Sequence, residues 1–270
     1  VSYIKWDMNR SITECYSVAL PADRQGEVFH RYILGVYDLY ERLTSEFPEV
    51  LFESCSSGGG RFDPGMLYYA PQGWTSDDSD AIERLKIQYG TSLCYPISSM
   101  GSHVSVIPNH QVFRKTPLHT RANVAYFGTF GYELDLNSLK EEEIAEVKEQ
   151  IIFMKKYRKL FQFGDFYRLK SPFEGNETIW MVVSEDKKTA IVGYYRTLNG
   201  VNQAYSRIKL QGLDPDMLYE NILNKTENYG DELMNFGLIT TDVTAGEVPG
   251  DATPCTDFES RIYILKAKEK

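Results

Sequence analysis

The chain is poor in cysteine and histidine, the residues that form disulfide frameworks and many metal centres. Its 270 residues include only four cysteines and four histidines. The cysteines lie far apart and form neither a CxxC motif nor a pair with a histidine: Cys15, Cys55, Cys94 and Cys255. Only His103 and His110 are close together, and no carboxylate joins them at ligand spacing. We therefore expect no disulfide framework, no metal and no other cofactor, but reduced thiols, as in a cytoplasmic protein.

The sequence also lacks an excess of positive charge and a long apolar run. The formal net charge of −9 at pH 7 disfavours nucleic acids and anionic membrane surfaces as partners, because both are negatively charged. No apolar stretch approaches the ~20 residues of a membrane-spanning helix. No charged-then-apolar leader precedes Val1, so we expect no export signal in the chain. A neutral or small polar partner fits better, and 42% hydrophobic residues are ample for a buried core.

The first part of the chain alternates predicted strands and helices. In order, they are a strand at 2–7, a helix at 24–46, a strand at 50–55, a helix from about 79, strand-and-loop units at 93–105 and 122–134, and a helix at 140–161. The helices have apolar residues at helical spacing, with Asp23 as the expected N-cap of the first and Pro48 as its expected end. This alternation predicts a parallel α/β architecture.

Beyond residue 163 the sequence changes character. Short segments rich in β-branched and aromatic residues are separated by turn sequences such as Leu198-Asn199-Gly200. They are TIWMVVSE, TAIVGYYRTL, SRIKLQGL, LYENILN and RIYILKAK. This pattern predicts an antiparallel β-sandwich. We therefore expect two domains, residues 1–163 and 164–270.

Reactive side chains of α/β barrels lie at the carboxyl ends of the strands. Four such places can be located here: Asp7, the loop 55–60, the pair Asp77 and Asp78, and the loop around His103. Two of them carry carboxylates. Glycoside hydrolysis uses two carboxyl groups across the anomeric carbon, about 5 to 5.5 Å apart when configuration is retained. Asp7 and Asp77 are about two βα units apart at roughly 30 residues per unit, so both can reach one cleft.

Each of these positions also has a purely structural interpretation. Asp7 alone is equally compatible with a strand-end cap, and Asp78 or Ser79 with a helix N-cap. Cys55 alone fits a buried thiol better than a ligand contact, and His103 fits a packed loop as well as a pocket. The glycines at 58–60 lack the GK[ST] sequence of a phosphate-binding loop.

Four long motifs carry a close resemblance to a known family. They are YIKWDMNR at 3–10, LFESCSSGGGRFDPGMLYY at 51–69, WTSDDSDAIERLKIQYGTS at 74–92 and GSHVSVIPNHQ at 101–111. In this order they resemble microbial α-galactosidases of the melibiase type, glycoside hydrolase family 36. The resemblance implies the second part of a (β/α)8 barrel followed by a C-terminal antiparallel β-sandwich. It also implies an N-terminal part of the same enzyme as a partner, and a homotetramer.

The same resemblance implies roles for individual residues. Asp7 matches the nucleophile that forms a covalent galactosyl intermediate, and Asp77 matches the acid/base, with Asp78 as the alternative. The matching substrate-binding positions are Lys5, Trp6, Asn9, Cys55, Ser57, Gly58, Trp74 and Asp78. Alternation along the strand places Lys5, Asp7 and Asn9 on one face and Trp6 on the other. The family more often has CSGGGG or CASGGG where this chain has CSSGGG, which leaves the contact of Ser57 open.

The function implied is that of a retaining exo-α-galactosidase acting on melibiose- and raffinose-type α-galactoside oligosaccharides. Two alternatives stay open. The chain is a catalytically incomplete part that serves assembly, or it belongs to a related α-N-acetylgalactosaminidase or β-L-arabinopyranosidase. The residues that read the sugar's C2 and C5 substituents lie partly in the missing half, so the motifs do not separate these specificities.

Overall fold

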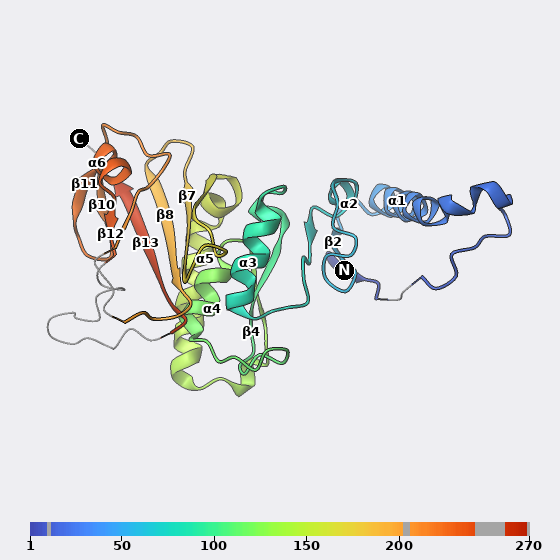
Figure 1. Cartoon of the computed structure of the whole chain (residues 1–270), viewed down its shortest axis with the longest axis horizontal. Helices are drawn as coiled ribbons and strands as arrows, with labels where there is room; N and C mark the ends of the chain where they lie inside the picture. The colour runs from blue at the N-terminus through green and yellow to red at the C-terminus, as the bar shows by residue number, and fades with distance from the viewer. Residues whose placement is uncertain (10–11, 202–205, 241–256, 269–270) are drawn as a thin grey trace. The chain divides into compact units, whose positions relative to one another are not determined.

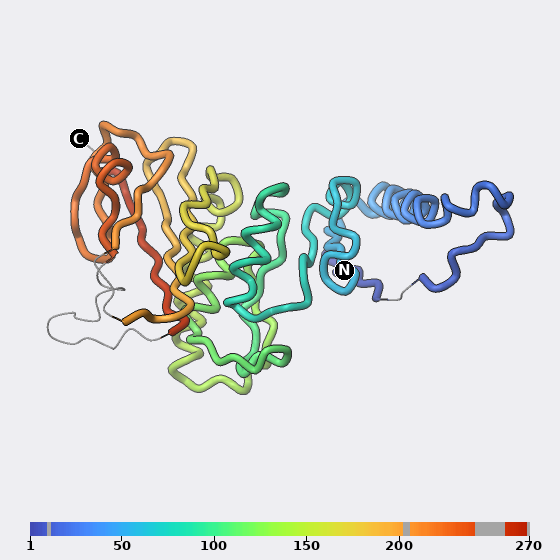
Figure 2. Tube along the Cα trace, in the orientation of Figure 1, coloured from blue at the N-terminus to red at the C-terminus, as the bar shows by residue number. Residues whose placement is uncertain are grey.

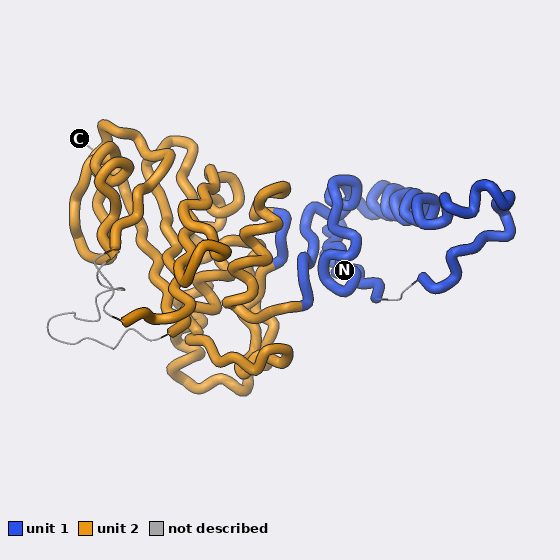
Figure 3. Tube along the Cα trace, viewed as in Figure 1, with its two compact units in different colours: residues 1–77, 99–101 blue, residues 78–98, 102–270 orange. Residues whose placement is uncertain are grey.

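The computed structural model describes residues 1–9, 12–201, 206–240 and 257–268; Arg10 of the first motif and Cys255 lie outside them. The chain folds into two compact units, residues 1–77 with 99–101 and residues 78–98 with 102–270 (Figure 3). Figure 2 follows the trace through each unit. The compact units divide near residues 77 and 101. This division does not test the domain boundary expected between residues 163 and 164, which stays a prediction. Within the described ranges, no helix is long and apolar enough to cross a membrane.

A three-stranded parallel sheet organises the first unit, in the order β1-β2-β3. Its strands are β1 (Tyr3–Asp7), β2 (Leu51–Cys55) and β3 (Gln72–Gly73). The two strands expected at 2–7 and 50–55 are thus confirmed. The register pairs Lys5 with Glu53 and Asp7 with Cys55. Since alternate residues point to opposite faces and paired residues to the same face, these four side chains share one side of the sheet.

Helices cover the other side of this sheet. Helix α1 (Val28–Glu46) follows the short 3₁₀ helix η1 (Ala22–Glu27), and α2 (Pro64–Tyr69) comes between β2 and β3 in the sequence. Figure 1 labels both α-helices. Their apolar side chains join those of β1 and β2 in one cluster, made of buried Tyr40, Phe52, Met66 and Ala70 with Trp6, Val36, Tyr37, Leu43, Val50 and Tyr69 packed against them. One face of the sheet therefore packs against the helices, and the other face carries Asp7.

The predicted N-cap at Asp23 is wrong. Asp23 lies inside η1, which begins after Pro21, and α1 begins after Glu27; neither preceding side chain makes a capping hydrogen bond. The φ of −66° at Pro21 suits the start of a helical turn, so the turn begins before the apolar periodicity does. The other end is as expected, because α1 ends at Glu46, shortly before Pro48.

The second unit begins with helices and a strand pair. Its helices are α3 (Ala81–Ser92), α4 (Leu118–Ala125) and α5 (Glu141–Phe163), with the 3₁₀ turns η2 (Ile97–Ser99) and η3 (Leu136–Ser138). Strand β4 (Gly101–Ser105), whose first residue belongs to the first unit, pairs with β5 (Thr129–Glu133). The helices expected from about 79 and at 140–161 are confirmed. The unit expected at 122–134 is a strand only in its second part, because residues 122–125 complete α4, where Ala122, Val124 and Ala125 are buried.

A six-stranded antiparallel sheet, in the order β11-β10-β13-β8-β7-β6, forms the rest of this unit. Its strands are β6 (Asp165–Lys170), β7 (Glu177–Val183), β8 (Thr189–Arg196), β10 (Leu218–Asn221), β11 (Glu227–Tyr229) and β13 (Glu259–Ala267). A second layer covers one face and consists of the pair β9 (Arg207–Ile208) and β12 (Leu238–Ile239) with helix α6 (Gly230–Asn235). The expected order of parallel α/β elements followed by antiparallel β structure is confirmed.

Aromatic packing joins the helices of this unit to the opposite face of the sheet. Phe127, just after α4, lies with its ring centroid 5.5 Å from that of Trp180 on β7, and Trp180 lies 5.2 Å from Tyr195 on β8. Phe161 of α5 contacts Phe127 edge-on at 5.1 Å. Large buried aromatic rings contribute much apolar area each, so α4 and α5 form one core with the sheet.

Candidate active site

Asp7 is the last residue of β1, and its carboxylate is surrounded by hydrogen-bond donors. The backbone N–H of Met8 donates to Oδ1 at 2.8 Å, and the side-chain amide of Asn9 donates to Oδ2 at 2.8 Å. Asn9 in turn accepts hydrogen bonds from Ser57, at 2.7 Å from its backbone nitrogen and 3.1 Å from its hydroxyl. Asn9 thereby links the end of β1 to the loop that follows β2.

These donors keep Asp7 ionised. Desolvation raises the pKa of Asp7, but hydrogen bonds from Asn9, from the Cys55 thiol and from the backbone N–H groups of Met8 and Ser57 outweigh it, so the pKa lies below the usual value. Burial raises the pKa of Cys55 to about 11, against a backbone hydrogen bond from Gly58, and the neighbouring carboxylate adds to the rise. The thiol therefore keeps its proton and donates a hydrogen bond to Asp7. An ionised, exposed carboxylate at a strand end is equipped to act as a nucleophile.

The loop after β2 lies directly against the segment 75–77. Ser57 and Gly58 have positive φ values, 47° and 80°. A Cβ on Gly58 would be 2.6 Å from Ser76 Cα and 2.9 Å from the backbone nitrogen of Asp77. Glycine is required because it tolerates the positive φ and leaves no side chain in this contact. The close approach brings the backbone of Asp77 to the loop that holds Asn9.

Lys5 lies two residues before Asp7 on β1, and its side chain is on the same face of the sheet. Its Nζ is 3.7 Å from Glu53 Oε1 and 4.8 Å from the centroid of the Trp74 ring. Trp74 and Glu53 are almost fully buried. The positions of Lys5 and Trp74 were expected from the sequence, whereas Glu53 was not, because an acidic residue within a short strand carries no motif of its own. The parallel register, which pairs Lys5 with Glu53, is the signal that identifies it.

Trp6 does not lie with these residues. Its ring packs 4.9 Å from Tyr40 of α1 and 6.2 Å from Phe52 of β2, centroid to centroid. The side chain is thus on the helix-covered face, as strand alternation requires. The inclusion of Trp6 among the substrate-binding residues stays a prediction, and this packing does not support it.

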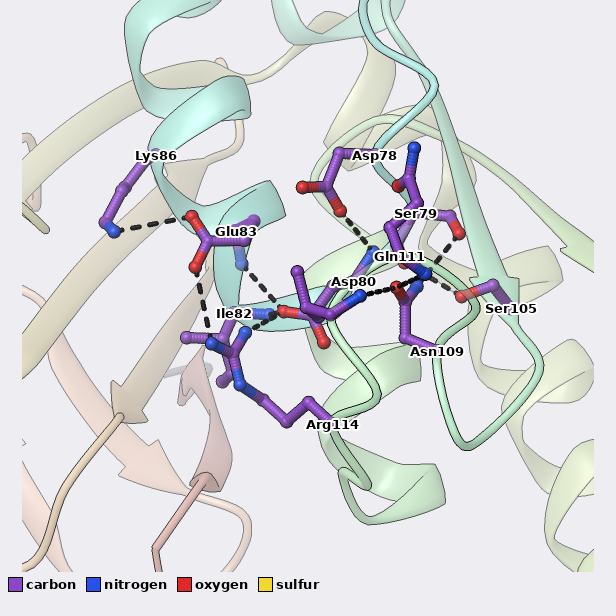
Figure 4. Close-up of polar contacts among 11 residues, drawn as sticks. Asp78, Ser79, Asp80, Ile82, Glu83, Lys86, Ser105, Asn109, Gln111 and Arg114 are labelled. Carbon is purple, nitrogen blue, oxygen red and sulfur yellow. Dashed lines mark hydrogen bonds and ion pairs between the residues drawn. The ribbon is translucent and has the colours of Figure 1, made fainter.

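Neighbouring residues of the acidic cluster 77–80 make different contacts. Asp80 is the N-cap of α3: its Oδ2 accepts 3.0 Å hydrogen bonds from the backbone nitrogens of Ile82 and Glu83 and pairs with Arg114 (Figure 4). Asp78 accepts a 3.0 Å hydrogen bond from the backbone of Asp80. The N-cap expected at Asp78 or Ser79 is therefore wrong by one or two residues. Capping by Asp80 leaves the carboxylate of Asp77, which is exposed, available for another role.

The histidines form no metal centre in the described part of the chain, where no group of three or more potential metal-ligating residues is found. His103 of β4 lies with Nδ1 3.2 Å from Glu133 Oε2 of β5. His110 is exposed. His103 therefore lies on a strand and not in the loop expected from the sequence, and its side chain connects β4 to β5.

Comparison with known proteins identifies the family. Residues 1–164 match the model of the Melibiase family, and residues 177–265 match that of the glycosyl hydrolase family 36 C-terminal domain. The chain belongs to the melibiase family. The melibiase motifs in the first unit include all the residues that surround Asp7.

Two relatives show how much of a melibiase this chain represents. It is 58% identical over 272 residues to alpha-galactosidase AgaA of Geobacillus stearothermophilus. The alignment covers 100% of this chain and 35% of the relative. It is 49% identical to alpha-galactosidase 1 of Pediococcus pentosaceus over 99% of this chain and 35% of the relative. The chain therefore spans about a third of the length of these relatives.

Solved melibiase structures share the fold. The alpha-galactosidase of Lactobacillus brevis superposes with a TM-score of 0.93 at 51% identity, covering 100% of this chain and 36% of that one. This confirms the expected fold class, a portion of a (β/α)8 barrel followed by an antiparallel β domain. Two structures of variants of the Geobacillus enzyme also match, each with a TM-score of 0.91. In one, an aspartate of the enzyme is changed to asparagine and raffinose is bound; in the other, a different aspartate is changed to alanine and stachyose is bound.

Proposed function

We propose that the whole protein containing this chain is a retaining exo-α-galactosidase that removes terminal α-D-galactosyl units from raffinose- and melibiose-type oligosaccharides by double displacement. The observation that carries the proposal is the environment of Asp7, an ionised carboxylate at a strand end held by Asn9, Cys55 and backbone N–H groups. Membership of the melibiase family and the raffinose and stachyose complexes of a close relative support the substrate class.

In this mechanism Asp7 attacks C1 of the galactosyl unit and forms a covalent ester. Asp77 first protonates the leaving oxygen and then takes a proton from the water that hydrolyses the ester, as the second carboxyl group of a retaining glycosidase does. The contact between Gly58 and the backbone of Asp77 supports this pairing, because it ties both residues to the same loop. In the Geobacillus complexes the two substituted aspartates are separated by the same number of residues as Asp7 and Asp77 are here.

The remaining residues of the site bind the sugar. Lys5 presents an ammonium group on the face of the sheet that carries Asp7. We assign sugar contacts to Lys5, Asn9, Cys55, Ser57, Gly58, Trp74 and Asp78. No cofactor is needed for this chemistry, because the two carboxyl groups supply both nucleophile and proton transfer.

The test is hydrolysis of p-nitrophenyl α-D-galactopyranoside by the longest natural chain that contains these residues, with the anomer of the released sugar followed by NMR. We expect α-galactose to appear first, and Asp7→Asn to abolish turnover without loss of the folded state. A matched control is Asp186→Asn, which changes another aspartate held by a hydroxyl and a backbone N–H, in a turn of the β domain. This control should keep full activity.

Substantial activity in the Asp7→Asn enzyme would overturn the proposal. The same assay with p-nitrophenyl α-N-acetylgalactosaminide and β-L-arabinopyranoside measures the two related specificities. Assay of residues 1–270 alone shows whether this part works by itself or serves only assembly. The proposal also includes division into domains 1–163 and 164–270, a homotetramer and a cytoplasmic location. Domain stability, native mass and cell fractionation test these three points in turn.

A further inference from the structure

We propose that Glu53 is a positioning residue for galactoside binding: its buried carboxylate fixes the ammonium group of Lys5 beside the nucleophile. The inference rests on the proposed function, because it places Lys5 in the sugar site. It adds a residue that touches no substrate and acts through Lys5.

Glu53 is only 3% exposed. An ionised carboxylate is strongly destabilised in a protein interior unless charges or hydrogen-bond donors compensate it. The cation in reach is Lys5, whose Nζ lies 3.7 Å from Oε1 and whose side chain is 34% exposed. Lys5 thus has its charged end between a buried carboxylate and the open face of the sheet.

The other oxygen of Glu53 is already occupied. The hydroxyl of Tyr3, on β1, donates to Oε2, and the amide of Gln72, on β3, donates to the same atom at 3.0 Å. Two donors from the flanking strands fix the rotation of the carboxyl group. Oε1 is left buried without a hydrogen-bond partner and faces Lys5. Burial, followed by the hydrogen bond to Glu53 and its charge, raises the pKa of Tyr3 far above the usual value, so Tyr3 remains a donor.

A second surface limits the movement of Lys5. The Trp74 ring, 4% exposed, lies 4.8 Å from Nζ. Gly101 leaves room for both partners, since a Cβ there would be 2.9 Å from Cε3 of Trp74 and 3.5 Å from Oε1 of Glu53. Lys5 is therefore held by a carboxylate and by an aromatic face, both of which attract a cation.

This arrangement has a consequence for binding. A lysine side chain is a flexible stem that loses much rotamer freedom when its ammonium group is fixed by a ligand. Glu53 and Trp74 restrict the ammonium before the sugar arrives, so less freedom is lost on binding. Removing the charge of Glu53 should weaken binding of substrate and transition state together, which raises KM more than it lowers kcat.

The test is a double-mutant cycle in the longest natural chain, with kcat and KM measured for p-nitrophenyl α-D-galactopyranoside. The variants are Glu53→Gln, which keeps an oxygen for Tyr3 but loses the charge, Lys5→Met, and the two combined. We expect Glu53→Gln to raise KM roughly tenfold with kcat within about twofold. In the Lys5→Met background the same change should alter KM by less than about twofold, because residues in contact are not additive.

The matched control is Glu177→Gln. Glu177 is another largely buried glutamate that pairs with a lysine, Lys170, and accepts a hydrogen bond from a tyrosine, Tyr194, but in the β domain. It should leave KM unchanged. A KM effect of Glu53→Gln that is equal in both backgrounds, or that the control reproduces, would overturn the positioning role. A wild-type enzyme that does not hydrolyse the galactoside would instead contradict the proposed function, so the two failures are distinguishable.

Discussion

Gly58 lies against Asp77 so closely that a Cβ on the glycine would be 2.9 Å from the aspartate's backbone nitrogen. The contact joins the loop after β2 to the segment that leads into α3. Ser57, the neighbour of Gly58, donates two hydrogen bonds to Asn9, and Asn9 donates to Asp7. One continuous set of contacts therefore runs from the proposed nucleophile to the backbone of the proposed acid/base.

Replacing Gly58 by alanine should damage this connection. The positive φ of 80° alone costs about 1 to 2 kcal/mol for a residue with a Cβ, and the 2.6 Å approach to Ser76 Cα forces the segment to move. We expect Gly58→Ala to lower kcat/KM for the galactoside at least 100-fold, since a displacement of about 1 Å at a reacting group has that effect. Steady-state kinetics of the folded variant measures it.

The control for this prediction is Gly35→Ala in α1. A Cβ on Gly35 would meet no atom within 4 Å, and alanine stabilises a helix by about 0.5 to 1 kcal/mol relative to glycine. Activity should be unchanged and the midpoint of denaturant unfolding slightly higher. Equal activity of the two variants would show that the close packing of Gly58 is irrelevant to catalysis.

The acid limb of the pH profile should depend on Asn9. Hydrogen bonds, of which that from Asn9 is the largest lowering contribution, hold the pKa of Asp7 below its usual value in spite of desolvation. Asp7 therefore stays ionised below the ordinary aspartate value of about 3.9. Because kcat/KM reports groups of the free enzyme, its acid limb should lie below that pH and move upward in Asn9→Ala. A limb that does not move would mean that Asp7 is not the group titrating there.

Azide should separate Asp77 from Asp78. In a retaining enzyme that lacks its acid/base, azide can attack the galactosyl intermediate and accelerate its breakdown, with retention of configuration. We expect azide to restore turnover of an activated aryl galactoside by Asp77→Ala and to yield α-galactosyl azide. Asp78→Ala should show no such rescue. The reverse pattern, followed by NMR of the azide product, would assign the role to Asp78.

Asp80 should contribute to stability and not to chemistry. Its carboxylate caps α3 and pairs with Arg114 while only 2% exposed. Loss of an N-cap costs about 0.5 to 2 kcal/mol, so Asp80→Ala should lower the free energy of unfolding by at least that amount. Asp80→Asn retains a capping oxygen and should lose less. Denaturant unfolding of both variants measures the difference, and equal losses would assign the stability to the Arg114 pair alone.

Much of this could be predicted from the sequence because the determinants are local. The strands of residues 3–7 and 51–55 and the helix ending at Phe163 have the periodicity and end signals of their elements. Asp7 and Asn9 follow from a strand alternation and a long motif. The shared face of these residues follows from alternation along one strand, whereas their contacts with Cys55 and Ser57 depend on pairing with a distant segment.

What the sequence missed depends on pairing between segments. The role of Glu53 requires the register that sets it beside Lys5 and Gln72, and no local pattern encodes that register. Asp80 could not be chosen as the N-cap within a run of six polar residues, 75–80, because Asp, Ser and Thr all serve as N-caps. Trp6 was placed in the site by similarity, although alternation along its own strand directs it into the packing with Tyr40.

The most direct test of the central claim is to trap the galactosyl intermediate. The longest natural chain is treated with a fluorinated galactosyl donor that carries a good leaving group and hydrolyses slowly from the enzyme, and the labelled peptide is sequenced by mass spectrometry. We predict one added galactosyl group per chain, attached to Asp7, and none in Asp7→Asn. A label on another residue, or turnover without any covalent label and with β-galactose released first, would contradict the assignment of Asp7 as the nucleophile.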